Sequence, residues 1–242
     1  LIKTGVSVLM LDGFANVTIF SSNGSSIKHA NITMKNSSNI IIRNIKFDEL
    51  WEWDEETSGD YDRNDWDYMT IDSACNGIWI DHCTFYKAYD GVIDVKNPSP
   101  ENNVTISWCE FLPGSEDDIF FDAMMDELDR NSEKYPYYQH LLDAGMTKSQ
   151  IRGYAYGQKK THLFGQSDEA ANAAGIKVTL ANNYYYNSMD RMPRLRYGYT
   201  HVYNCIMDAQ ELRDTRKSIT NEDIAKKLSL IHISEPTRRS YI

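Results

Sequence analysis

The segments "IWIDHCTF" at residues 78–85 and "VTISWCEF" at residues 104–111 follow one pattern: a run rich in β-branched residues, a short polar turn and an apolar residue. The pattern returns in "IIIRNIKF", "VTLANNYY" and "THVYNCIM". These segments start at residues 40, 78, 104, 178 and 200, so neighbours lie 38, 26, 74 and 22 residues apart. Short strands at such spacings are too close for βαβ units and predict a right-handed parallel β-helix, an all-β fold.

The coils of a β-helix stack about 4.8 Å apart, so equivalent positions of successive repeats form a ladder. The alignment puts on one ladder the residues Ile45, Cys83, Cys109, Asn183 and Cys205. We therefore expect the cysteines to be buried, unpaired thiols. A disulfide between Cys83 and Cys109 is also possible at this spacing. None of the four cysteines has the CxxC spacing of a metal site.

The interval of 74 residues contains an insertion at about residues 112–158. Its segment "DDIFFDAMMDELDR" has apolar residues at helical spacing, which predicts a helical excursion packed on the solenoid. Alternatively, the insertion forms one wall of a substrate cleft, where tyrosines could stack on sugar rings. The tyrosines in question are Tyr137, Tyr138, Tyr154 and Tyr156.

The bulk composition limits the functional classes. The chain has 242 residues and a formal net charge of −10, which argues against a nucleic-acid partner. No run of eighteen apolar residues could span a membrane, and no signal peptide is visible. We expect one domain at residues 1–227, truncated at both ends, and a non-native tail at residues 228–242, where "LSLIHISEPTR" resembles a translated sequencing adapter.

Aspartates cluster in "GDYDRNDWDYMTID" at residues 59–72 and in "YDGVIDVK" at residues 89–96. Oxygen ligands at this density indicate calcium, although their spacing does not fit an EF-hand. Asp90 and Asp94 would share one face of an extended strand. Asp90 and Asp94 could instead be the general acid and base of a glycoside hydrolase. As a further alternative, clusters of aspartates are common in solvated loops.

Basic residues gather in two later segments. "KKTHLFGQSD" begins with Lys159 and Lys160, and "DRMPRLRYG" places Arg191, Arg194 and Arg196 around a proline. Lone lysines are usually solvated, so these basic residues are candidates for a functional site only if the solenoid brings them beside the aspartates. Each group lies near a strand segment of a successive coil, which favours that arrangement.

Taken together, these motifs, in this order across residues 39–207, resemble the calcium-dependent pectate lyases of the parallel β-helix fold. The resemblance implies that Asp67, Asp90 and Asp94 bind Ca²⁺, with Asp65 at a position that is acidic in some members. It implies further that Lys160 and Arg196 bind substrate and that Arg191 takes the proton. Arg194 has no assigned role, and we expect it to pair with an aspartate. The role of His162 stays open.

The implied reaction is β-elimination on polygalacturonate, which leaves unsaturated products. The resemblance also implies a secreted protein, and we expect a monomer that binds neither nucleic acid nor membrane. Two alternatives stay open: a hydrolase of polygalacturonate, and a non-catalytic β-helix that binds pectin.

Overall fold

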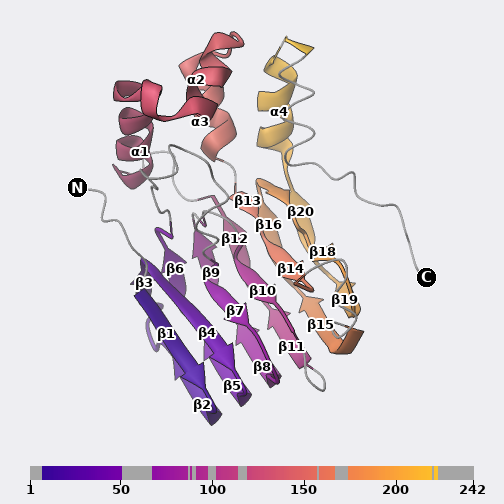
Figure 1. Ribbon diagram of the computed structural model, residues 1–242. Helices are drawn as coiled ribbons and strands as arrows, with labels where there is room; N and C mark the ends of the chain where they lie inside the picture. Colours follow the sequence, from indigo (N-terminus) through magenta and orange to yellow (C-terminus); the bar gives the residue numbers. More distant parts are fainter. Residues whose placement is uncertain are drawn as a thin grey trace.

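The computed structural model describes residues 7–50, 67–86, 88, 91–97, 102–113, 119–156, 158–166, 174–219 and 221–222. Within these ranges the chain winds through three six-stranded parallel sheets (Figure 1). The first sheet contains β1 (Ser7–Asp12), β4 (Ala30–Lys35), β7 (Met69–Ile71), β10 (Ile93–Val95), β14 (His162–Phe164) and β18 (Arg194–Leu195). The second contains β2 (Ala15–Phe20), β5 (Ser38–Arg43), β8 (Asn76–Asp81), β11 (Asn102–Ser107), β15 (Ile176–Ala181) and β19 (Tyr199–Tyr203).

The third sheet contains β3 (Ser26–Lys28), β6 (Lys46–Asp48), β9 (Thr84–Tyr86), β12 (Glu110–Leu112), β16 (Tyr184–Tyr186) and β20 (Ile206–Asp208). Each coil contributes one strand to each sheet, which confirms the predicted parallel β-helix. The five repeats found in the sequence are the bends from the second sheet into the third. Their β-branched runs are the second-sheet strands, and their final apolar residues lie in the third sheet.

Inward-facing side chains of successive coils stack on one another and form the core. On the second sheet Ile40, Ile78, Val104 and Val178 are in register, and all are buried. On the third sheet Phe47, Phe85, Phe111 and Tyr185 form a continuous ring stack, with centroid separations of 5.0, 5.2 and 4.7 Å. Rings stacked in this way bury large apolar areas at the centre of the solenoid.

The predicted ladder of thiols is confirmed. The backbone N–H groups of Thr84, Glu110 and Tyr184 donate to Ile45, Cys83 and Cys109 respectively, so the predicted positions do stack. Cys75, Cys83 and Cys109 are buried and Cys205 is partly buried, and all four are free. The disulfide that the spacing would permit is therefore absent.

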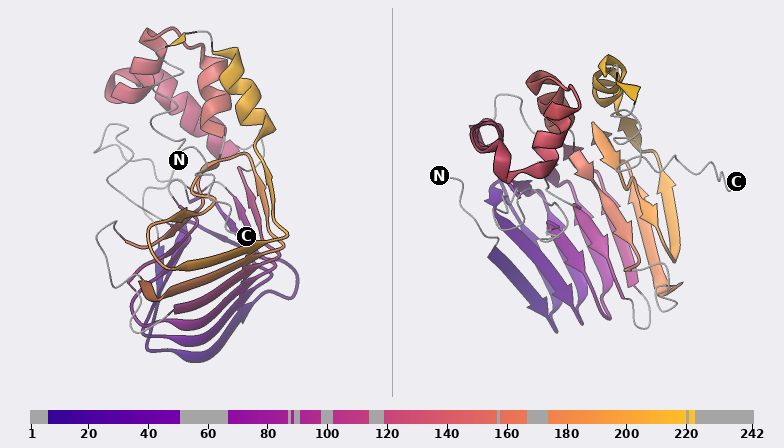
Figure 2. Two further views of the ribbon diagram at one scale, coloured as in Figure 1. Left: turned by 90° about the vertical axis from the view of Figure 1, so that its right-hand side faces the viewer. Right: turned by 45° about the horizontal axis from the view of Figure 1, so that its top comes forward.

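The insertion is helical, as predicted. It contains α1 (Ile119–Arg130), a short 3₁₀ turn η1 (Ser132–Lys134), α2 (Pro136–Asp143) and α3 (Lys148–Tyr156). The helices gather on one side of the solenoid, where α3 packs against α4 (Gln210–Ser218) (Figure 2). Within the ranges described, no helix is long and apolar enough to cross a membrane.

The suggested role of the insertion tyrosines in sugar stacking is wrong for Tyr138. This side chain is only 3% exposed, and its hydroxyl donates to Asp129. The side chains of Tyr137, Tyr154 and Tyr156 lie outside the described part of the chain.

Candidate active site

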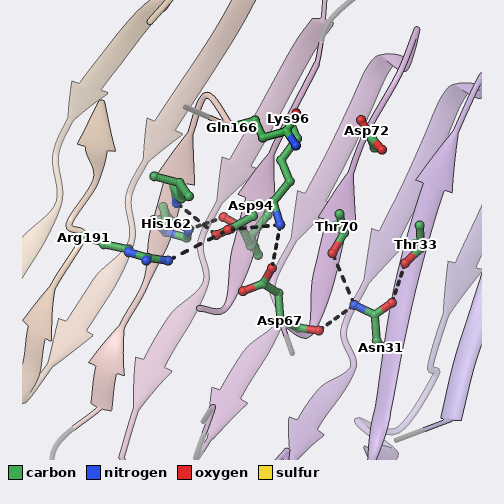
Figure 3. A network of polar contacts seen from close by, with 12 residues as sticks. Asn31, Thr33, Asp67, Thr70, Asp72, Asp94, Lys96, His162, Gln166 and Arg191 are labelled. Carbon is green, nitrogen blue, oxygen red and sulfur yellow. Dashed lines mark hydrogen bonds and ion pairs between the residues drawn. The ribbon is translucent and has the colours of Figure 1, made fainter. Parts of the chain in front are cut away.

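Two of the predicted calcium ligands converge on the outer face of the first sheet. Asp67 lies two residues before β7, and Asp94 is the central residue of the neighbouring strand β10 (Figure 3). Each is 1% exposed. The Lys96 Nζ lies 3.5 Å from the Asp67 Oδ2 and 3.7 Å from the Asp94 Oδ2, between the two carboxylates.

The strands hold these carboxylates by alternation and by backbone hydrogen bonds. Ile93 and Val95 are buried inward, so Asp94 points outward, where its Oδ1 accepts from the Leu163 N–H at 3.1 Å. The backbone carbonyl of Asp67 accepts from the Asn31 Nδ2 at 2.6 Å, and the Asn31 side chain is itself buried. The Asp67–Asp94 pair is thus fixed in position by neighbouring coils.

Arg191 comes to this pair from a later coil. It follows β17 (Ser188–Asp190), which pairs with β13 (Gln158–Lys160), and it takes a left-handed backbone conformation with φ of 58°. Its N–H donates to the Asp190 Oδ1 and its carbonyl accepts from the His162 N–H, both at 2.7 Å. Its Nη1 lies 4.0 Å from the Asp94 Oδ2. The Met192–Pro193 peptide that follows is cis.

The surroundings of Asp67 suit a bound cation. Burial raises the pKa of the Asp67 carboxyl, and the charges of Lys96 and Arg191 oppose this shift only in part. The Asp67 Oδ1 has no hydrogen-bond partner among the described residues. At Gly91 a β-carbon would collide with the Asp67 Oδ1 and come within 2.9 Å of the Asp94 Oδ1, so only glycine fits beside the two carboxylates. This buried oxygen pair matches the hard-ligand chemistry of Ca²⁺.

The other two predicted ligands, Asp65 and Asp90, lie outside the described residues. In the part of the chain that the structure describes, no group of three or more His, Cys, Asp or Glu residues could hold a metal ion. The calcium site with Asp65, Asp67, Asp90 and Asp94 therefore stays a prediction. Of these four residues, the structure describes Asp67 and Asp94.

The predicted substrate-binding residues lie on adjoining segments. Lys160 ends β13, in register with Asp190, the residue before Arg191. Arg196 follows β18, and its Nη1 donates to the carbonyls of Gly165 and Gln166 in the loop after β14. Arg194 is exposed and forms no ion pair with any carboxylate in the described ranges, so its expected aspartate partner is not found there.

Near the site, Lys96 was not identified from the sequence, and the role of His162 was left open. Lys96 is two positions after Asp94, so strand alternation could have placed both on one face. His162 is fully buried: its Nδ1 is 3.3 Å from the Ile93 carbonyl, and its Nε2 is 3.1 Å from the Tyr185 hydroxyl. Burial lowers the pKa of His162 to about 3. It is therefore a neutral core residue behind the site.

Comparison with known proteins shows similarity to pectate lyases. A family model described as "Pectate lyase" matches residues 13–141 and 147–229. Pectate lyase B of Paenibacillus amylolyticus is 49% identical over 223 residues, which are 90% of this chain and 56% of that protein. The pectate trisaccharide-lyase of Thermotoga maritima is 31% identical over 190 residues, which are 77% of this chain and 38% of the relative. The chain thus spans about half the length of the Paenibacillus amylolyticus protein, and a smaller share of the Thermotoga maritima protein.

Solved structures show the same fold. A pectate lyase from Paenibacillus sp. 0602 superimposes with a TM-score of 0.83 at 46% identity, covering 93% of this chain and 51% of that one. Pectate lyase C from Erwinia chrysanthemi reaches a TM-score of 0.51 at 17% identity, over 84% of this chain and 44% of that one, which is a likeness of fold alone. On the strength of the match to the family model, this chain belongs to the pectate lyase family.

Proposed function

We propose that this chain carries the active site of a secreted, calcium-dependent pectate lyase that cleaves polygalacturonate by β-elimination. The observation that carries the proposal is the Asp67–Asp94 pair with the Arg191 guanidinium beside it, 4.0 Å from Asp94. The relatives named pectate lyase and pectate trisaccharide-lyase support the same chemistry.

The difficult step is removal of the C5 proton of a galacturonate unit. This proton is α to a carboxylate, so its removal adds negative charge to a group that is already anionic. Ca²⁺ bound by Asp67 and Asp94, with Asp65 and Asp90, would neutralise part of this charge. Lys160 and Arg196 would bind substrate carboxylates and contribute further positive charge.

Arg191 would accept the C5 proton. The electron pair of the broken C–H bond forms the C4–C5 double bond, the C4–oxygen bond breaks, and the leaving oxygen takes a proton from solvent. Arginine normally keeps its proton up to about pH 12. We therefore expect the reaction to become faster towards alkaline pH, where a neutral guanidine is easier to form.

The test follows the ultraviolet absorbance of polygalacturonate, which rises as unsaturated products form. We expect a rise that needs Ca²⁺, stops with excess chelator and is lost in Arg191→Ala. The matched control is Arg194→Ala, which removes an exposed arginine three residues away and should keep the rate within about twofold.

Two results would contradict the proposal. New reducing ends without a rise in absorbance would show a hydrolase. Neither signal from a protein with an intact circular dichroism spectrum would show that the chain is non-catalytic.

A further inference from the structure

A second group of cationic and aromatic side chains lies on the second sheet, away from the strands that carry Asp94 and Arg191. We define the second-sheet site by its residues Phe20, Arg43, Trp79, His82 and Trp108. Phe20, Arg43 and His82 line a hollow of about 450 Å³ together with Thr18, Ser21 and Asn44. The strand register places Phe20, Arg43, Asp81 and Ser107 on four successive coils, with His82 and Trp108 one residue further on.

A buried carboxylate organises this site. Asp81 is 1% exposed. Its Oδ2 forms an ion pair with the Arg43 Nε at 3.1 Å and lies 2.7 Å from the His82 Nδ1. Its Oδ1 accepts from the Ser107 hydroxyl at 2.7 Å, and that hydroxyl accepts from the Trp79 Nε1 at 2.8 Å. Asp81 therefore holds three side chains directly, and Trp79 through Ser107, in a fixed arrangement.

The apolar rings of the site face outward. Phe20 is 66% exposed, Trp108 is 56% exposed and Trp79 is 39% exposed. The His82 ring stacks on Trp108, with centroids 5.9 Å apart and an interplanar angle of 19°. Large exposed rings around a fixed cation are typical of a binding surface, because such rings would otherwise be buried.

The backbone at this corner supports a role other than stability. At the corner between the second and third sheets, the backbone takes a left-handed conformation on successive coils. Three of these corner residues are asparagines, Asn44, Asn182 and Asn204, with φ between 53° and 58°. Asparagine adopts this conformation readily. On the two middle coils His82 and Trp108 take the same conformation, with φ of 50° and 54°. A bulky tryptophan is unfavourable there, and more than half of the Trp108 surface stays exposed.

The chemistry of the site indicates its ligand. The Nε of Arg43 pairs with Asp81, whereas its two terminal amino groups make no hydrogen bond within the described part of the chain, and Arg43 lines the hollow. A guanidinium binds a carboxylate through two parallel hydrogen bonds. Aromatic faces beside it can stack on the C–H faces of sugar rings. A carboxylate on a sugar ring, which is a uronate, satisfies both features.

We propose that the second-sheet site is a non-catalytic binding site for a uronate-bearing polysaccharide chain. The ligand lies along the solenoid axis across four coils, a span of about 14 Å at the spacing of parallel strands. The second-sheet site holds the polymer on the protein while the active site on the first sheet acts on another part of the same polymer. The identity of the polymer as polygalacturonate rests on the proposed function, whereas the site itself does not.

The test is affinity electrophoresis of the full chain in gels containing polygalacturonate, with chelator present so that calcium-dependent turnover is absent. We expect the polymer to retard the protein, and neutral galactan to leave its migration unchanged. The variant Arg43→Gln/Trp108→Asn should bind polygalacturonate at least fivefold more weakly. Trp108→Asn introduces the residue that the corner favours, so the fold should be retained, which circular dichroism and a thermal melt would verify.

The matched control is Lys177→Gln/Tyr199→Ala, which removes one cation and one aromatic ring from neighbouring coils of the same sheet. It should bind like the unmodified chain. Lyase activity is scored separately, as ultraviolet absorbance with Ca²⁺. An Arg43→Gln/Trp108→Asn variant that binds as tightly as the unmodified chain would overturn the inference, as would equal retardation by galactan or no retardation at all. If polygalacturonate retards the unmodified chain but not the variant, and neither shows lyase activity, the binding site is supported and the proposed function is contradicted.

Discussion

Asp67 is held in a place where its negative charge is unfavourable unless a cation is bound. Burial raises the pKa of its carboxyl, so as the pH rises the unfolded chain loses this proton at a lower pH than the folded chain does. In the absence of calcium, the stability that depends on Asp67 is therefore complete at low pH and lost as the pH rises through the raised pKa.

We predict that Asp67→Asn stabilises the calcium-free chain at pH 8, by on the order of 1 kcal/mol. The amide keeps the shape of the side chain without its charge, and Lys96 still has Asp94 at 3.7 Å. The measurement is the urea midpoint in the presence of chelator. Asp129→Asn is the control: this exposed carboxylate pairs with Lys148 at 2.6 Å, and its removal should give no gain. An unchanged or lower midpoint for Asp67→Asn would show that burial is not the dominant influence on this carboxyl.

His162 should make the fold sensitive to acid. Its pKa is about 3 in the folded chain, against about 6.5 when unfolded, because burial disfavours the imidazolium. The unfolded state therefore binds the extra proton first as the pH falls. The stability that depends on neutral His162 is complete above pH 6.5 and is lost progressively down to about pH 3, by up to about 1.4 kcal/mol per pH unit.

We predict that His162→Gln flattens the pH dependence of the unfolding free energy between pH 6.5 and 4.5. The glutamine amide can donate to the Ile93 carbonyl and accept from the Tyr185 hydroxyl, the two partners of the histidine, and it does not titrate. Urea unfolding at several pH values measures both slopes. Parallel slopes for the unmodified chain and the variant would exclude His162 as the acid-sensitive group.

At the scale of the elements, the third sheet depends on its continuous ring stack. Phe111 lies in the middle of this stack, between Phe85 and Tyr185, and it also meets the edge of the His162 ring at 4.8 Å. Phe111→Ala removes contacts on both sides and leaves a cavity that the rigid neighbouring coils cannot fill. We predict a loss of about 3–5 kcal/mol in the free energy of unfolding, measured by urea titration. Phe20→Ala, which removes an exposed ring, should cost less than about 0.5 kcal/mol.

The elements also explain which parts of the fold could be predicted from the sequence. The bend from the second sheet into the third places apolar residues and turn residues at fixed offsets, so the repeats were visible. The first-sheet strands β7, β10 and β14 have only three residues each. Such strands are too short to show alternation, and the loops between them vary in length. The sheet that carries the candidate site was therefore the part that the repeats did not reveal.

The site itself was predicted mainly through the family resemblance. Asp67, Asp94 and Arg191 meet in space, as expected, although the last two are 97 positions apart (191 − 94). Residue spacing alone left Asp94 open to a different role in hydrolysis. The proximity of Lys96 and the burial of His162 depend on how coils stack, which no local pattern specifies.

At the scale of the whole molecule, the solenoid builds sites from successive coils. Asp94 lies in β10, Asp67 lies just before β7, and Arg191 follows β17. The second-sheet site likewise comes from four neighbouring coils. In a solenoid each coil contacts mainly its neighbours. A ligand that joins several coils should therefore stabilise them together.

Because of this coupling, we predict that Ca²⁺ raises the midpoint of thermal unfolding. If Asp67 and Asp94 hold the ion in the folded chain only, Ca²⁺ at one hundred times its dissociation constant adds about 2.7 kcal/mol of stability. For a chain of this size that corresponds to a rise of about 5–10 °C in the unfolding midpoint. Differential scanning calorimetry with Ca²⁺ and with chelator measures it. Asp94→Asn should lose most of the shift, because Asp94 is one of the two buried carboxylates, whereas Asp129→Asn should keep it. A shift of equal size in Asp94→Asn would place the ion elsewhere on the chain, and the electrostatic argument for this site would then fail.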